Sequence, residues 1–154
     1  MEPRLGVTVY EVGPRDGLQN EPDALEPAVR AELVRRLVRA GVRAVEVASF
    51  VDPRRVPQMA GAEEVVAALQ RTQGVVYAGL ALNERGFDRL VAADLDEVRF
   101  AFGVTESFNQ RNQGATVDES LEAASTILTQ GRASGLRTTV TLSVAWGDPW
   151  EGRV

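Results

Sequence analysis

The chain has 154 residues, of which 44% are hydrophobic and 25% are charged, a balance typical of one globular domain with a sizeable core. Its net charge is −5 and its 17 basic residues, all of them Arg, are dispersed, which excludes the concentrated basic surface of a nucleic-acid-binding protein. Cys and His are absent, so disulfides, thiolate chemistry and imidazole ligands are excluded, and no apolar run approaches the ~20 residues of a membrane helix.

The first predicted elements are a strand, a helix and a second strand. Residues 5–11 (LGVTVYE) are predicted to be extended because Val and Tyr favour strands. Residues 27–40 (PAVRAELVRRLVRA) show helical spacing of apolar side chains, with Pro in the first turn and Gly41 just beyond the end. Residues 42–48 (VRAVEVA) form the second strand. The amino terminus lacks the layout of a signal peptide, so we expect a cytoplasmic protein.

The same alternation continues along the rest of the chain. We predict helices over residues 61–71, 84–93 and 116 to about 134, and strands over residues 75–82, 97–102 and 136–144. Thr116 and Glu119 form a capping-box pattern that begins the last helix. The polar residues 105–115, which precede this helix, are predicted to form a long loop.

This alternation implies parallel strands joined by right-handed crossovers. The two usual outcomes are a doubly wound sheet and a (β/α)8 barrel. Five strand–helix units cannot close an eight-stranded barrel, which usually takes about 250 residues. The pattern therefore predicts an α/β fold that is either a small open sheet or part of a barrel, and periodicity leaves that choice open.

The second predicted strand carries a carboxylate that we expect to be buried. Val45 and Val47 lie on one face, which suits packing beneath helices, whereas Glu46 lies between two alanines on the other face. A face of small residues with one carboxylate suits a barrel interior near a polar site. Because a buried carboxylate is costly unless it is paired, protonated or bound to metal, Glu46 is either functional or part of a salt bridge to an Arg on a neighbouring strand. The sequence favours the two equally.

The densest polar segment, EVGPRDGLQNE (residues 11–21), follows the first strand directly. Ligands of parallel α/β folds bind at the carboxyl ends of strands, and the two glycines of this segment permit tight turns. Arg15 could hold an anion or a developing oxyanion, and Asp16 could bind a hard cation such as Mg²⁺. The alternative is a surface turn, because Gly, Pro, Asp and Asn are common turn residues.

Three further segments are expected at the same edge of the sheet. Residues 103–114 (GVTESFNQRNQG) include Arg111 and several amides that could meet phosphates or a pantetheine chain, although such loops are often merely solvated. Residues 49–53 (SFVDP) follow the second strand, and Asn83 ends the third.

Together these motifs resemble the hydroxymethylglutaryl-CoA (HMG-CoA) lyase family. EVGPRDGLQNE is similar to the opening motif of that family, whereas related metal-dependent barrels such as isopropylmalate and homocitrate synthases share only the Arg-Asp-Gly core. Further similar stretches follow in the same order: VEVASFVDPRRVPQM (residues 45–59), Asn83 with Gly86-Phe87, Glu106-Ser107-Phe108 with Asn112, and SVAWGDPWEG (residues 143–152). The resemblance spans nearly the whole chain.

The resemblance implies that residues 1–154 are a single domain, the first five units of a (β/α)8 TIM barrel. It also implies a retro-Claisen cleavage of 3-hydroxy-3-methylglutaryl-CoA to acetyl-CoA and acetoacetate, as in leucine degradation, with Mg²⁺ or Mn²⁺ as a Lewis acid. Asp16 would be a metal ligand, Arg15 would neutralise the developing enolate oxygen, and Glu46 would assist proton transfer or orient the groups around the metal. The residues implied to line the substrate pocket are Arg15, Gln19, Ser49 and Asn83.

The chain also departs from the family pattern. The family completes its metal site with a His-x-His pair near strand seven, and neither this pair nor a later Gly-rich loop with a mobile Cys is present. We therefore expect a truncated lyase with an incomplete metal site that is inactive as an isolated chain. Val144 and Asp148 stand where the animal-type motif carries Cys.

The expected partner is an acyl-CoA substrate, with neither nucleic acid nor membrane. We also expect the chain to form a homo-oligomer or to depend on a missing C-terminal segment. Two alternatives stay open: an acyl-CoA lyase or synthase with a different acyl group, and a non-catalytic half-barrel that serves as an assembly module.

Overall fold

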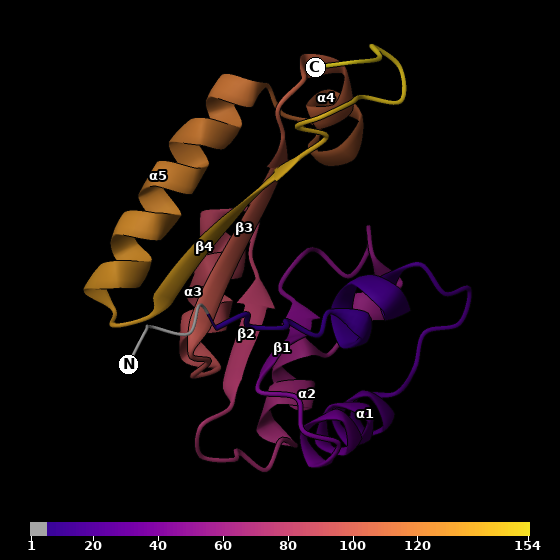
Figure 1. Cartoon of the computed structure of the whole chain (residues 1–154), viewed down its shortest axis with the longest axis vertical. Helices are drawn as coiled ribbons and strands as arrows, with labels where there is room; N and C mark the ends of the chain where they lie inside the picture. Colours follow the sequence, from indigo (N-terminus) through magenta and orange to yellow (C-terminus); the bar gives the residue numbers. More distant parts are fainter. Residues whose placement is uncertain (1–5) are drawn as a thin grey trace.

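The computed structural model describes residues 6–154 and contains a four-stranded parallel sheet (Figure 1). The strands are β1 (Ala44–Ser49), β2 (Val76–Leu80), β3 (Glu97–Gly103) and β4 (Arg137–Ser143), and they lie in the order β1-β2-β3-β4. Strands that pair in sequence order form the wall of a barrel, whereas a doubly wound sheet reverses its strand order at a switch point. The strand order therefore favours the barrel over the open sheet.

Helices connect the strands and cover one face of the sheet. The helices are α1 (Pro27–Arg39), α2 (Ala62–Ala67), α3 (Glu84–Ala92), α4 (Glu106–Gln113) and α5 (Val117–Ala133), with a π-helix η1 (Gly13–Gly17) and a 3-10 helix η2 (Pro57–Met59). Apolar side chains from helices and strands form one core between the two layers, including Val34, Val45, Val47, Phe87, Leu90, Val98, Phe100 and Ile127. No helix within residues 6–154 is both long and apolar enough to span a membrane.

Most predicted elements are confirmed, with ends that shift by a few residues. The largest shift is in the helix predicted over residues 61–71, because α2 ends at Ala67. The capping box at the start of α5 is confirmed: Thr116 Oγ1 accepts from the Glu119 backbone N–H at 3.1 Å, and Glu119 Oε2 accepts from the Thr116 N–H at 2.8 Å.

The long loop predicted over residues 105–115 is wrong, because Glu106–Gln113 forms α4. This helix is too polar to show the apolar periodicity on which sequence prediction depends. Asn109 fixes it in place: its Oδ1 accepts from the Gly103 N–H at 2.9 Å, and its Nδ2 donates to the carbonyls of Ala115 and Thr116, both at 2.9 Å.

The first predicted strand is also wrong for most of its described length, and Leu5 lies outside the described residues. Only Glu11 among residues 6–11 pairs with a strand, through a parallel bridge to Val45. Residues 6–10 run across the sheet instead of along β1 (Figure 1). Tyr10 explains this path, because its hydroxyl donates to Glu97 on β3 and its ring packs against Arg99.

Candidate active site

Three predicted site residues meet where η1 lies against β1. Arg15 donates from Nε to Glu46 Oε1 and from Nη1 to Asp16 Oδ1, the second at 2.8 Å. The tight η1 turn creates this arrangement, because the N–H groups of Arg15 and Asp16 both donate to the Val12 carbonyl, at 3.0 and 2.7 Å. Single-turn π-helices of this kind are frequent at functional sites. Arg15, Asp16 and Glu46 therefore converge at this point of the fold.

Glu46 is only 1% exposed, yet both of its carboxylate oxygens are paired. Oε1 accepts from Arg15, and Oε2 accepts from Arg99 Nη1 at 3.1 Å. Of the two uses considered for a buried Glu46, the salt bridge to an Arg of the sheet is present, formed with Arg99 on β3, and Glu46 also contacts Arg15 at the rim. Two guanidinium partners compensate the desolvation of the carboxylate.

Further ion pairs and hydrogen bonds connect Glu46 to the start of β3. Arg99 Nε donates to Glu97 Oε1 at 3.0 Å, and the Arg99 guanidinium carbon lies 3.9 Å from the centre of the Tyr10 ring. Tyr10 donates its hydroxyl proton to Glu97 Oε2. We refer to Tyr10, Arg15, Glu46, Glu97 and Arg99 as the charge network. It runs from the base of β3 to the rim at Arg15.

The environment of Glu97 shifts two pKa values. Burial and the hydrogen bond to Glu97 raise the pKa of Tyr10 above its usual value. Burial by itself would raise the pKa of Glu97, but hydrogen bonds from Tyr10, Arg99 and Thr139 together hold that pKa below its usual value. Glu97 is therefore the ionised acceptor and Tyr10 the neutral donor of this pair.

A small residue on β2 allows Arg99 to reach Glu46. In the sheet register, Ala78 lies between Glu46 on β1 and Glu97 on β3, so these three side chains share one face. Ala78 is fully buried, and its methyl group leaves room for the guanidinium to cross β2. The β1–β2 register also shifts between Glu46 and Ala48, an irregularity of the kind that re-aims side chains near active sites.

Sequence reasoning missed three members of the charge network, Tyr10, Glu97 and Arg99. One signal was available, because Glu97 and Arg99 alternate on β3 and so put two charges on the face opposite Val98 and Phe100. Which charges pair across an intervening strand depends on register and side-chain reach, and sequence spacing alone does not provide these.

The other predicted pocket residues form no hydrogen bond with Arg15 among the described residues. Ser49 is fully buried at the end of β1, and its Oγ has no hydrogen-bond partner within the described residues. Asn83 caps α3, with Oδ1 accepting from the Gly86 N–H at 2.8 Å. Gln19 is half-buried in the turn after η1. An unpaired buried hydroxyl makes Ser49 the best suited of the three to meet a ligand.

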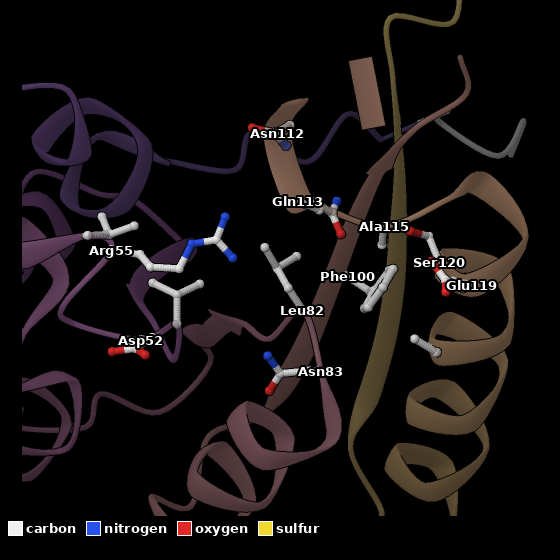
Figure 2. A pocket seen from close by; sticks show the side chains of 13 residues that line it. Asp52, Arg55, Leu82, Asn83, Phe100, Asn112, Gln113, Ala115, Glu119 and Ser120 are labelled. Carbon is white, nitrogen blue, oxygen red and sulfur yellow. The ribbon is translucent and has the colours of Figure 1, made fainter. Parts of the chain in front are cut away.

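A cavity of about 420 Å³ lies at the carboxyl end of β2. In Figure 2, Asp52 and Arg55 lie on one side of it, Gln113, Ala115, Glu119 and Ser120 lie on the other, and Leu82 and Asn83 lie between them. Arg111, which could meet phosphates or a pantetheine chain, stacks on Trp150, with its guanidinium carbon 4.2 Å from the ring centre. Arg55 is therefore the guanidinium that borders this cavity.

The described residues do not by themselves build a metal centre. Within residues 6–154, no group of three or more His, Cys, Asp or Glu side chains is placed to hold a metal ion. Asp16 offers one carboxylate, 56% exposed and paired with Arg15. Mg²⁺ requires near-octahedral oxygen coordination, so Asp16 fits as a single ligand and not as a complete site.

Parallel strands in sequence order, with polar side chains gathered at the carboxyl ends of the strands, are the arrangement found in TIM-barrel enzymes. The HMGL-like family model matches residues 6–149, and the chain belongs to the HMGL-like family. Its structure corresponds to part of a TIM barrel, as the resemblance implied.

Individual members of the family are similar to this chain over nearly all of its length. It is 42% identical to (R)-citramalyl-CoA lyase of Chloroflexus aurantiacus, over 96% of this chain and 50% of the relative. It is 41% identical to the 3-hydroxy-3-isohexenylglutaryl-CoA/hydroxy-methylglutaryl-CoA lyase of Pseudomonas aeruginosa, over 96% of this chain and 49% of that protein. An HMG-CoA lyase from Acinetobacter baumannii, solved with coenzyme A and 3-methylmalate, superposes with a TM-score of 0.90 at 30% identity, over 96% of this chain and 48% of that structure. The chain thus spans about half the length of the relatives that it matches.

Proposed function

We propose that this chain provides the oxyanion-binding part of a carbon–carbon lyase that cleaves 3-hydroxy-3-methylglutaryl-CoA to acetyl-CoA and acetoacetate, a reaction of leucine degradation. The position of Arg15 carries this proposal. Glu46 and Asp16 engage its Nε and Nη1, and its Nη2 has no hydrogen-bond partner within the described residues. A fixed guanidinium whose Nη2 group is unused can donate to a substrate oxygen.

In the proposed reaction, a general base takes the proton of the tertiary hydroxyl, the oxygen forms the new carbonyl, and the adjacent carbon–carbon bond breaks. The bonding electrons pass to the acetyl-CoA fragment as an enolate, which is then protonated. Arg15 stabilises the negative charge that develops on the enolate oxygen. Because both Glu46 oxygens already accept from guanidinium groups, we assign Glu46 the role of orienting Arg15 and not that of transferring the proton.

A divalent cation, Mg²⁺ or Mn²⁺, belongs to this proposal, with Asp16 as one ligand. When bound, it would polarise the substrate hydroxyl and carboxylate oxygens. Its remaining ligands would be water or groups outside residues 6–154, because no three His, Cys, Asp or Glu side chains of these residues are placed to hold a metal ion. We therefore expect this chain alone to bind the cation weakly.

The acyl-CoA class of substrate is supported by two observations. The solved relative from Acinetobacter baumannii contains coenzyme A. The cavity beside Asn83 lies at the carboxyl ends of the strands, where ligands of barrel enzymes bind, and Arg55 borders it as a partner for an anionic group.

Acetoacetate release from 3-hydroxy-3-methylglutaryl-CoA with Mg²⁺ or Mn²⁺ tests the proposal. The assay compares the chain alone with the chain mixed with a separately expressed polypeptide that corresponds to the second half of a relative and contains its His-x-His pair. We expect turnover in the mixture, its loss in Asp16→Asn, and little turnover by the chain alone. Metal-dependent turnover by the chain alone would show that one carboxylate is enough, and no turnover in either preparation would contradict the proposal.

A different acyl group is the second candidate, and the 42% identity to (R)-citramalyl-CoA lyase favours it. Release of pyruvate from (R)-citramalyl-CoA in the same two preparations separates the candidates. Binding to the second-half polypeptide without turnover of either thioester would favour the non-catalytic assembly module.

A further inference from the structure

We propose that Arg99 is a positioning residue of this site: it anchors Glu46 from the interior of the sheet and thereby holds the Arg15 guanidinium at the rim. This inference deepens the proposed function and rests on it for its catalytic consequence. Its structural part, the dependence of Arg15 on Arg99, can be tested separately.

Arg99 is itself held on three sides. It donates to Glu46 Oε2 at 3.1 Å and to Glu97 Oε1 at 3.0 Å, and it stacks on the ring of Tyr10. Its side chain is only 15% exposed. Thr139 on β4 also donates to Glu97 Oε1 at 2.9 Å, so that the anchor of Arg99 is fixed by a neighbouring strand. A guanidinium restrained in this way can serve as a fixed point for Glu46.

Glu46 transmits this restraint to Arg15 because each guanidinium uses a different carboxylate oxygen. Arg15 takes Oε1 and Arg99 takes Oε2. If Arg99 is removed, Oε2 becomes a buried acceptor without a charged partner. The carboxylate can then regain two donors by turning toward Arg15 and accepting from both sides of its guanidinium fork.

That rearrangement would draw the free donor of Arg15 away from the substrate. In the charge network, two Arg side chains balance two Glu side chains, with Asp16 as an additional carboxylate at the rim. Without Arg99, Arg15 is the one guanidinium left among these three carboxylates. The attraction toward the interior therefore increases, and a displacement of about 1 Å at a catalytic group can lower turnover about 100-fold.

A matched control lies in the connection between α2 and β2. Arg71 also lies over a tyrosine, 5.0 Å from the Tyr77 ring centre, and also pairs with a carboxylate, that of Asp96. It has no contact with Glu46 or Arg15 among the described residues. Arg71→Met therefore removes an Arg with similar packing without touching the proposed anchor.

The structural test uses the chain labelled with ¹⁵N-arginine and follows the side-chain Nε–H signals. The Arg15 signal is assigned by its loss in Arg15→Met. Because Glu46 draws Arg15 inward when Arg99 is absent, we expect Arg99→Met to move this signal further from the position of free arginine and to slow its exchange with water at least about tenfold, and Arg71→Met to leave it unchanged. Arg99→Lys should act in the same direction but less strongly, because an ammonium cannot reproduce the guanidinium fork.

Circular dichroism establishes whether each variant is folded. If Arg99→Met does not fold, the Arg15 signal of Arg99→Lys provides the test. An unchanged Arg15 signal in folded Arg99 variants, or an equal change in Arg71→Met, overturns the inference. This measurement needs no substrate, so its failure is distinct from a failure of the proposed function.

The kinetic test uses whichever preparation turns over an acyl-CoA substrate. Arg99→Met should lower kcat about 10- to 100-fold with a change in KM below about threefold, and Arg99→Lys should restore part of kcat. Unchanged kcat in a folded Arg99→Met protein would overturn the catalytic part. Absence of turnover in the wild type would sink the proposed function and the catalytic role that rests on it, whereas the Arg15 signal would still decide the structural role.

Discussion

Arg15 depends on a small number of contacts for its orientation, and its replacement separates binding from catalysis. We expect Arg15→Met to lower kcat at least about 100-fold with a much smaller change in KM, because a donor to the enolate oxygen acts mainly in the transition state. Steady-state kinetics of acetoacetate release in the active preparation measure both parameters.

Arg54→Met is the matched control for Arg15→Met. Arg54 is an exposed guanidinium with a single partner, Asp52. Its loss should leave kcat within about twofold of the wild type, because an exposed ion pair contributes little. If Arg15→Met raised KM and left kcat unchanged, Arg15 would be a substrate-binding residue without a special role in the transition state.

Strand β2 contributes to the site through the small size of one side chain. Ala78→Val would fill the space through which Arg99 reaches Glu46, and overpacking of this kind costs about 1–3 kcal/mol of unfolding free energy. We expect lower stability in chemical denaturation together with a displaced Arg15 Nε–H signal. Ala81→Val, at an equally buried alanine in the hydrophobic core, should lower stability without moving that signal. If the Arg15 Nε–H signal had the same position in Ala78→Val and Ala81→Val, β2 would not control the Arg99–Glu46 contact.

Helix α1 carries an acid-sensitive cluster around Glu32. Hydrogen bonds from Arg36 and Arg35 and the nearby charge of Arg39 lower the pKa of Glu32 from 4.5 to about 2. Because the folded-state pKa is the lower one, Glu32 stabilises the folded chain above about pH 4.5, and this contribution is lost as the pH falls toward about 2.

Denaturation of the wild type and Glu32→Gln at several pH values tests this effect. The stability difference between them should be largest above about pH 5 and should close near pH 2. Glu122→Gln, which replaces an exposed α5 carboxylate without an ion pair among the described residues, is the control. A constant difference between wild type and Glu32→Gln across this range would contradict the prediction.

The elements differ in how well their sequences predict them, for physical reasons. Helix α1 and strands β2 to β4 follow from apolar periodicity, and α5 begins at the predicted capping box. Helix α4 has no apolar face and owes its position to Asn109, a tertiary contact. The segment before Glu11 has strand propensity but is diverted across the sheet by Tyr10. In both places, side-chain contacts made in the folded chain determine the backbone path, and local sequence propensity does not.

The residues of the candidate site also differ in how well the sequence predicts them. Arg15, Asp16 and Glu46 could be predicted because they follow or lie on parallel strands, whose carboxyl ends share one edge. Arg99 could not, because its role depends on reaching across β2. Strand β2 ends at Leu80, and Asn83, which was predicted to end that strand, caps α3 instead.

The molecule as a whole leaves apolar groups and a strand edge open. Strand β4 pairs with β3 on one side and with no strand of residues 6–154 on the other. Large apolar side chains are exposed beside it and at both ends of the described chain, among them Val7, Val9, Leu142 and Trp146. Open edges and apolar patches favour association.

We therefore expect the purified chain to self-associate, with a mean mass that rises with concentration in light scattering. Leu142→Lys, which puts a charge on the β4 edge, should shift the equilibrium toward monomer, and so should the polypeptide that corresponds to the second half of a relative. Leu121→Lys, at an exposed residue on α5, is the control. A monomer at all concentrations would contradict this prediction.

The charge network has a consequence for building chimeric enzymes. Its two guanidinium groups and two buried carboxylates all belong to one half-barrel, so their charges are matched before any other polypeptide joins. A second half that closes the barrel would need to supply shape, edge pairing and metal ligands, but no counter-ion for this interior. Second halves from different relatives could therefore be exchanged on this half without disturbing the support of Arg15.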